Sequence, residues 1–296
     1  MLKAMKSGTR KRIATAVAVV SAATALMVTS PGSSTAAVTA TPRLMAYGIT
    51  ADGLTMASFY TDTPGTLNWV QDVTGLSGDT KLVGIDHRVQ NGLMYGLGEK
   101  GGIYTISTPP TTTGVVVTKV SQLQIALYGT SFDIDFNPAA DRLRVISNNG
   151  QNLRHNLNDG TTVADSVLTL PPLTTAAIGV TGAAYTNNDL VGSTGTTLSN
   201  VDTYNDQITI QSPPNAGNLV PTGLFGFDAN LEAGYDIFST LTNGKTTANT
   251  AFAALTPYGG RASFYGIDIL TGTPTLIGQF PSVVPITDFT VSISGS

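Results

Sequence analysis

Four aspartates recur at one position of a repeated strand pattern, and their type and spacing suit a chemical role. They are Asp86, Asp135, Asp236 and Asp288, each in the middle of a short apolar run. A ring of carboxylate oxygens is the ligand set that a hard cation such as Ca²⁺ prefers. Four such runs around one channel would therefore form a candidate Ca²⁺ site. The alternative, which we favour, is that each aspartate accepts hydrogen bonds from backbone N–H groups of a neighbouring unit, because repeated residues usually serve the repeat.

The two histidines give weaker indications of chemistry. His87 directly follows Asp86, and a histidine beside a carboxylate is a candidate general base. Neighbours on a strand point to opposite faces, so we expect His87 in solvent or between units, and not in one pocket with Asp86. His155 lies among polar residues on an outer strand, and we expect it to be exposed. Histidines placed in this way supply no zinc ligand set.

Other catalytic motifs are missing from the sequence. It contains no Gly-x-Ser-x-Gly elbow, no His-Glu-x-x-His and no phosphate-binding glycine loop. It also contains no cysteine, which excludes a thiol nucleophile, a haem attachment site, an iron–sulfur cluster and disulfides.

Arginine and aromatic residues offer two further hypotheses. Arg142 and Arg144 are two residues apart and share a strand face, so they could hold an anion. The default expectation is an ion pair with Asp141 or Asp159. Tyrosines and phenylalanines recur through the units, and we expect most of them to pack between units. A few at strand ends would remain free to stack on sugar rings.

The elements that must position these residues are strands. Short alternating runs follow residue 43, and Asn-Gly and Asp-Gly pairs separate them, which is typical of all-β folds. Four units of about four strands are recognisable, each the size of a propeller blade. They cover residues 82–121, 132–170, 178–220 and 234–280.

The two ends of the chain complete each other. Residues 286–292 have the pattern of a first strand, and residues 44–73 have the pattern of the later strands of a unit. We therefore predict a β-propeller of five blades, each with about four antiparallel strands, in which the N- and C-terminal strands complete one blade. Closure of this kind removes free sheet edges. Six blades is the alternative, if residues 234–280 contain an additional pairing.

The first residues predict export from the cell. Residues 1–36 form a signal peptide, with a basic start, an apolar run of 16 residues at 13–28 and cleavage between Ala36 and Ala40. The run is shorter than the roughly 20 residues that span a bilayer. We expect a short linker at 37–43, one propeller domain at 44–293, and a secreted, extracellular or periplasmic protein with no integral membrane segment.

The charge of the mature chain excludes some classes of partner. Cleavage removes five of the 15 basic residues and none of the 19 acidic residues, which leaves a formal charge of −9. Nucleic acids and anionic lipids bind clustered cations, so we expect neither as a partner. We expect a monomer.

Several segments resemble a known family. They are residues 63–76, 82–107, 131–156, 183–188 and 211–220, and they are similar to the family called domain of unknown function 4394 across nearly all of residues 44–292. The resemblance implies a secreted bacterial β-propeller-like domain. It brings no catalytic residues, because the family has no assigned activity.

Two functional hypotheses follow. The first is a non-catalytic binding module at or outside the cell envelope, which binds a protein or a glycan through one face of the ring and needs no cofactor. The alternative is a Ca²⁺-dependent hydrolase or lactonase, in which the four channel aspartates hold the metal and the metal polarises a carbonyl or activates water.

Overall fold

The computed structural model describes residues 40–294, and strands dominate this part of the chain. Its helical structure is a short 3-10 turn, η2 (Pro214–Ala216). No helix among these residues is long and apolar enough to cross a membrane. The predicted signal peptide, residues 1–36, and the start of the predicted linker lie outside the described residues. For the part that is described, the all-β prediction is confirmed.

Three sheets each contain four consecutive strands in antiparallel order. The first sheet consists of β8 (Phe132–Asn137), β9 (Arg142–Ser147), β10 (Asn152–His155) and β11 (Thr162–Ala164). The second consists of β12 (Val180–Tyr185), β13 (Leu198–Asp202), β14 (Gln207–Gln211) and β15 (Leu219–Leu224). The third consists of β16 (Ala229–Thr242), β17 (Lys245–Pro257), β18 (Ser263–Ile267) and β19 (Pro274–Gln279). These sheets match three of the predicted units.

A larger sheet contains the remaining strands, in the order β20-β1-β2-β3-β7-β6-β5-β4. One half consists of β4 (Leu82–His87), β5 (Met94–Gly98), β6 (Gly102–Ser107) and β7 (Val115–Gln122). The other half consists of β20 (Ile286–Val291), β1 (Met45–Thr50), β2 (Thr55–Tyr60) and β3 (Leu67–Thr74). Within residues 40–294, the strands of the two halves pair only at a short parallel bridge between β3 and β7, through Val73 with Val115 and Thr74 with Val116. Each half thus repeats the four-stranded plan.

The ends of the fold meet in one sheet, as predicted. Strand β20 pairs with β1 in antiparallel register, from Ala46 opposite Val291 to Thr50 opposite Ile286. The N–H of Ser292 extends the pairing to the carbonyl of Met45, at 2.8 Å. The last strand therefore covers an edge of β1 that would otherwise be open to other chains.

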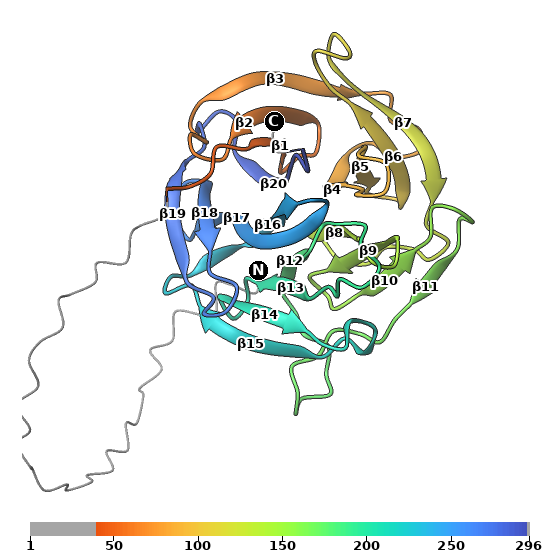
Figure 1. Cartoon of the computed structure of the whole chain (residues 1–296), viewed down its shortest axis with the longest axis vertical. Coiled ribbons are helices and arrows are strands. Elements are labelled where there is room, and N and C mark those ends of the chain that lie inside the picture. The colour runs from red at the N-terminus through yellow and green to blue at the C-terminus, as the bar shows by residue number, and fades with distance from the viewer. Residues whose placement is uncertain (1–39, 295–296) are drawn as a thin grey trace, which may run out of the picture. The chain divides into compact units, whose positions relative to one another are not determined.

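One strand from each four-stranded group lies innermost, and these strands surround the centre of the molecule (Figure 1). Around the centre, β4 contacts β8, β8 contacts β12, β12 contacts β16, β16 contacts β20, and β20 contacts β4. The approach of β16 to β20 depends on a glycine. A Cβ atom at Gly234 would lie 2.6 Å from the Cα of Asp288. The arrangement is propeller-like.

The predicted hairpin turns have the backbone conformation that their residues favour. Gly53, Gly92, Gly150, Gly160 and Gly244 all have positive φ angles, between 67° and 84°. In the β16–β17 turn, the preceding Asn243 also has a positive φ, of 52°. Two consecutive residues of this kind are typical of the tight turn that matches the twist of paired strands.

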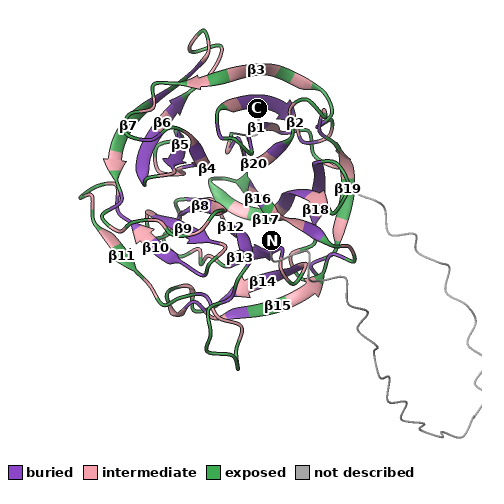
Figure 2. Cartoon of the chain, turned by 180° about the vertical axis from the view of Figure 1, so that it is seen from behind, coloured by how far each residue is buried: buried purple, intermediate pink, exposed green. Residues whose placement is uncertain are grey.

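The hydrophobic core lies between the faces of neighbouring sheets. Tyr95 of β5 packs on Phe136 of β8 with ring centroids 5.1 Å apart, and Phe59 of β2 packs on Phe264 of β18 at 5.3 Å. Figure 2 shows mostly buried inner strands and more exposed outer strands. These contacts agree with the prediction that aromatic residues pack between units. Each sheet is thus held by the neighbours on its two sides.

Candidate functional site

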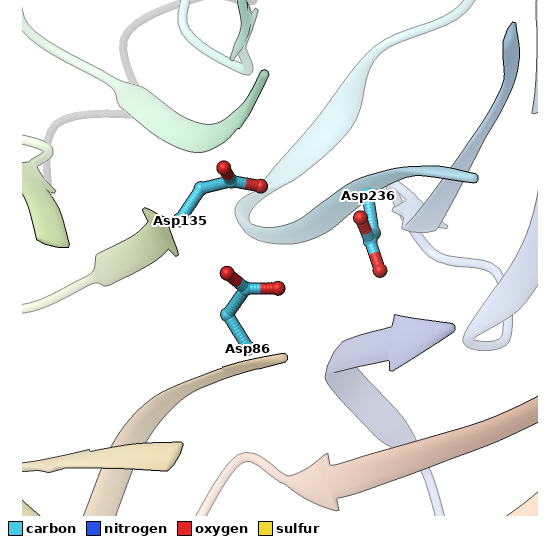
Figure 3. Close-up of side chains that lie close together, drawn as sticks. All are labelled: Asp86, Asp135 and Asp236. Atoms are coloured by element: carbon cyan, nitrogen blue, oxygen red, sulfur yellow. The ribbon is translucent and has the colours of Figure 1, made fainter. Parts of the chain in front are cut away.

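Three of the four predicted aspartates come together at the centre. Asp86 of β4, Asp135 of β8 and Asp236 of β16 are buried, and one carboxylate oxygen from each lies within 4.8 Å of the others. Figure 3 shows the three side chains directed toward one another from three separate strands. We call these three residues the carboxylate triad. The convergence that the repeated spacing predicted is therefore present for three positions.

The fourth predicted aspartate, Asp288 of β20, lies outside the triad and beside a residue that the sequence analysis missed. That residue is Asp133, which precedes Asp135 by two positions and so lies on the same face of β8. The charge of Asp288 is the strongest electrostatic neighbour of Asp133. The sequence did contain a signal for Asp133. Side chains alternate along a strand, so if Asp135 faces the channel, residue 133 faces it as well.

Most of these carboxylates also accept hydrogen bonds from the next innermost strand. Asp86 Oδ2 accepts from the N–H of Phe136 at 2.7 Å, and Asp288 Oδ2 accepts from Ile85 at 2.9 Å. Asp236 Oδ2 accepts from Val291 at 2.6 Å. These bonds join β4 to β8, β20 to β4, and β16 to β20. The predicted alternative, in which the aspartates serve the repeat, is thus confirmed for these three positions.

Strand β8 makes the same kind of link to β12, twice. Asp133 Oδ2 accepts from the N–H of Ala183 at 2.8 Å, and Asp135 accepts from the backbone N–H of Tyr185. Strand β12 itself has Ala184 at the position that matches Asp135, and Gly182 at the position that matches Asp133. Its junction with β16 is instead closed by Asn188, which donates to the carbonyl of Ile237 at 2.9 Å.

A threonine hydroxyl connects two triad carboxylates to a histidine. Thr290 Oγ1 lies 3.1 Å from Asp236 Oδ2, 3.4 Å from Asp86 Oδ1 and 2.9 Å from His87 Nδ1. His87 is buried between sheets and its ring also lies near that of Tyr47, at 5.9 Å. The prediction of an inter-unit histidine is confirmed. Thr290 of the neighbouring strand reaches both Asp86 and His87, a shared contact that the sequence did not predict.

Burial shifts the protonation of this centre. It raises the pKa of Asp236 to about 6 and that of Asp288 to about 8. Burial first, and the charge of a neighbouring carboxylate second, raise the pKa values of Asp86, Asp133 and Asp135. Burial lowers the pKa of His87 to about 4, so this ring is neutral at pH 7. A neutral imidazole cannot balance the carboxylates.

His155 is the clearest error among the predicted side chains. It is fully buried, where the sequence predicted exposure. Its Nε2 lies 2.8 Å from Ser121 Oγ and its Nδ1 lies 2.9 Å from Thr162 Oγ1. Two hydroxyl partners satisfy both ring nitrogens, which is why a polar side chain is tolerated there.

The arginine pair also differs from its prediction. Arg144 is buried and forms its ion pair with Asp165, at 2.7 Å, and not with Asp141 or Asp159. Arg142 donates to the backbone carbonyls of Ala140 and Asp141. The Arg144 guanidinium also bonds side chains of three other residues, Tyr185, Asn152 and Asn215. These four bonds engage four of the five N–H donors of Arg144 inside the fold.

Hollows lie at both ends of the channel. The strand-start face is the side on which β4, β8, β16 and β20 begin, and the strand-end face is the opposite side. On the strand-end face, a hollow of about 10 Å³ is bordered by Asp86, Asp236 and Asn188. It has room for an ion or a water molecule, and not for an organic substrate. The hydrolase alternative gains no support from this geometry.

The strand-start face has larger hollows. One of about 310 Å³ lies between the β1–β2 turn at Asp52 and residues 283–285. A second, of about 240 Å³, lies between Arg261 and residues 280–282. Pro285 borders both. A third, of about 50 Å³, is bordered by Thr50, which also borders the first hollow, and by Asp288. The three hollows therefore adjoin one another across this face.

Comparison with known proteins gives a family and a distant set of similar structures. The sequence model of the family described as "Domain of unknown function (DUF4394)" matches residues 55–290. The comparison with curated proteins found no match.

Among solved structures, the chain is similar to the WD40 domain of Toxoplasma gondii coronin, with 12% identity, a TM-score of 0.40, and 76% of this chain and 54% of that chain covered. It is similar to an auxiliary nutrient binding protein from Bacteroides thetaiotaomicron, with 12% identity, a TM-score of 0.38 and 70% of this chain covered. The alignment spans 55% of that protein's chain. Glutaminyl cyclase from Myxococcus xanthus shows 10% identity, a TM-score of 0.42, and coverage of 72% of this chain and 92% of that chain.

Proposed function

This chain belongs to the family described as a domain of unknown function (DUF4394), and we propose that it is a secreted, five-bladed β-propeller that acts as a non-catalytic binding module. The halves of the eight-stranded sheet count as two blades in this proposal, because in the described residues their strands pair through a two-residue bridge alone. Residues 234–280 contain parts of the four strands of one sheet, which favours five blades over six.

The observation that carries the proposal is the set of adjoining hollows on the strand-start face. Concave surfaces with apolar walls and a few polar groups are the usual form of binding sites. Val283, which borders the hollow of about 310 Å³, is 85% exposed. Tyr258 is 70% exposed, and it lies in the sequence between Thr256 and Gly260, which border the second hollow. Asp52 and Arg261 supply hydrogen-bonding groups at the borders of the hollows.

The chemistry of this face favours a neutral glycan of the cell envelope as the partner. Exposed aromatic rings stack on the apolar faces of sugars, and neighbouring polar side chains bond the hydroxyl groups. The predicted mature charge of −9 repels anionic polymers. A separate hollow for each of several sugar units would suit an extended chain better than the flat surface of a folded protein.

The test compares binding of the purified mature protein to neutral polysaccharides and to proteins of the cell envelope. We expect Tyr258→Ala to weaken glycan binding by at least tenfold, and Tyr258→Phe to retain most of it because the ring remains. Leu190→Ala is the control, because Leu190 is 63% exposed on a loop near the strand-end face. Equal loss from Tyr258→Ala and Leu190→Ala, or binding to proteins alone, would contradict the glycan proposal.

A further inference from the structure

We propose that the centre of the channel binds one divalent cation, with Ca²⁺ as the preferred ion, between the three carboxylates of the triad. The cation would join β4, β8 and β16 and stabilise the ring. This role is independent of the binding proposed for the strand-start face.

The spacing of the triad oxygens fits the ion. Ca²⁺ binds oxygen ligands at roughly 2.3–2.6 Å, so ligands on opposite sides of it lie about 5 Å apart. Asp86, Asp135 and Asp236 each offer an oxygen within 4.8 Å of the other two. The Thr290 hydroxyl, at 3.1 Å from Asp236 and 3.4 Å from Asp86, is a further oxygen beside them. A hollow of about 10 Å³ borders two of the three triad residues, Asp86 and Asp236.

The charges around the triad also call for a cation. Five aspartates are buried at this centre: Asp86, Asp133, Asp135, Asp236 and Asp288. None of the ion pairs within residues 40–294 includes one of them. Buried carboxylates are costly unless they are paired, neutralised or bound to a metal.

A second, independent observation is an acceptor without a donor. Asp288 is 6% exposed, and its Oδ1 has no hydrogen-bond donor among the described residues unless the neighbouring Asp133 carries a proton. Asp288 lies at the same centre, where its Oδ1 would be 2.8 Å from a Cβ atom placed on Gly234, two residues before Asp236. The Thr290 hydroxyl has one proton for two triad carboxylates. The centre therefore has more hydrogen-bond acceptors than donors. Protons on the carboxylates, or a bound cation, would satisfy the remaining acceptors.

The ligand chemistry selects the class of cation. All donors at the triad are oxygens, and oxygen-only sites favour Ca²⁺, Mg²⁺ or Mn²⁺ over zinc or copper. His87 Nδ1 is engaged with Thr290 and the chain has no cysteine. Ca²⁺ accepts irregular coordination, whereas Mg²⁺ requires a near-ideal octahedron of closer ligands. Ligands drawn from three separate sheets suit the more adaptable ion.

The test uses the purified mature protein, treated with a chelator and then dialysed. Calorimetric titration at pH 7.5 should show one Ca²⁺ per chain and weaker binding of Mg²⁺. The melting temperature should rise with Ca²⁺ concentration, because a ligand that binds only the folded state stabilises it. Asp135→Asn should weaken Ca²⁺ binding at least tenfold. Asp202→Asn is the matched control, since Asp202 is equally buried but bonds Asn205 and Gln207, outside the triad.

A measurement on the unmodified protein keeps the test decisive if Asp135→Asn does not fold. That measurement is the Ca²⁺ titration itself, with one ion expected per chain and a rise in melting temperature as the Ca²⁺ concentration increases. No Ca²⁺ binding at millimolar concentration, or unchanged binding by Asp135→Asn, would each overturn the proposal. In the first case, protons alone neutralise the centre.

Discussion

The aspartates of the innermost strands act first as acceptors for backbone N–H groups of the neighbouring sheet. Asp133 shows this most clearly, because Oδ1 accepts from Ile134 and Oδ2 accepts from Ala183, both at 2.8 Å. In Asp133→Asn, the amide NH₂ would face one of these N–H donors. We expect a loss of roughly 1–3 kcal/mol in the free energy of unfolding. Urea unfolding measures it, and an unchanged midpoint would show that Asp133 does not hold β8 to β12.

Two arginines on strand β9 allow a test of how much a buried ion pair contributes to stability, compared with a partly exposed arginine. Arg144 is buried and bonds Asp165, whereas Arg142 is partly exposed and bonds backbone carbonyls. Arg144→Met leaves the buried Asp165 with Arg154 as its remaining ionic partner. We expect a loss of about 3 kcal/mol for Arg144→Met, and less than about 1 kcal/mol for Arg142→Met. Chemical unfolding of both variants checks this, and similar losses would contradict it.

Strand β20 carries the closure of the ring. It pairs with β1, and its apolar side chains Ile286, Phe289 and Val291 are almost fully buried. Their burial contributes on the order of 5–9 kcal/mol, at 1.5–3 kcal/mol for each side chain. This is comparable to the whole stability of a typical domain, about 5–15 kcal/mol.

We therefore expect a chain that ends at residue 285 to lose its cooperative unfolding transition. A chain that ends at residue 293 should retain it, because it keeps β20 and the bond from Ser292 to Met45. Thermal melting followed by circular dichroism distinguishes the two. A peptide of residues 286–294, added to the shorter chain, should restore part of the transition. If the shorter chain melts like the longer one, the closing strand is dispensable.

The strand patterns predicted the sheets well because alternation and turn residues are local properties. The same patterns could not predict the height of a side chain along the channel, which depends on the stagger between strands. Asp288 bonds Ile85, the residue before Asp86, whereas Asp86 bonds Phe136, the residue after Asp135. This stagger separates Asp288 from the triad, although all four aspartates occupy similar positions in their patterns.

Sequence patterns also could not predict which residues on irregular segments form hydrogen bonds with the strands. The predicted unit extends to residue 170, but its last strand, β11, ends at Ala164. The next residue, Asp165, accepts bonds from both Arg144 and Arg154. Its contacts depend on how the chain leaves the sheet, which no period in the sequence specifies. His155 was misplaced for a similar reason, because Ser121, one of its two partners, belongs to a neighbouring sheet.

At the scale of the whole molecule, the buried carboxyls make stability depend on pH. A carboxyl whose pKa is raised by folding binds more protons in the folded state than in the unfolded state. Its contribution is full below the unfolded pKa, near 4, and is lost as pH rises through the folded pKa. This loss extends to about 6 for Asp236 and about 8 for Asp288. His87, with its pKa lowered to about 4, has the opposite effect below about 6.5.

Between pH 6.5 and 8 the carboxyls alone among these groups titrate, so we expect the chelator-treated protein to lose stability as pH rises through this range. The measurement is the urea midpoint at pH 6.5, 7.25 and 8. Asp288→Asn is the control. It removes the group whose pKa is raised to about 8, so the urea midpoint of this variant should change less between pH 6.5 and 8. General repulsion among surface charges would instead leave the slope unchanged in this variant. Stability that stays constant or rises from pH 6.5 to 8 without a cation would contradict the raised pKa of Asp288.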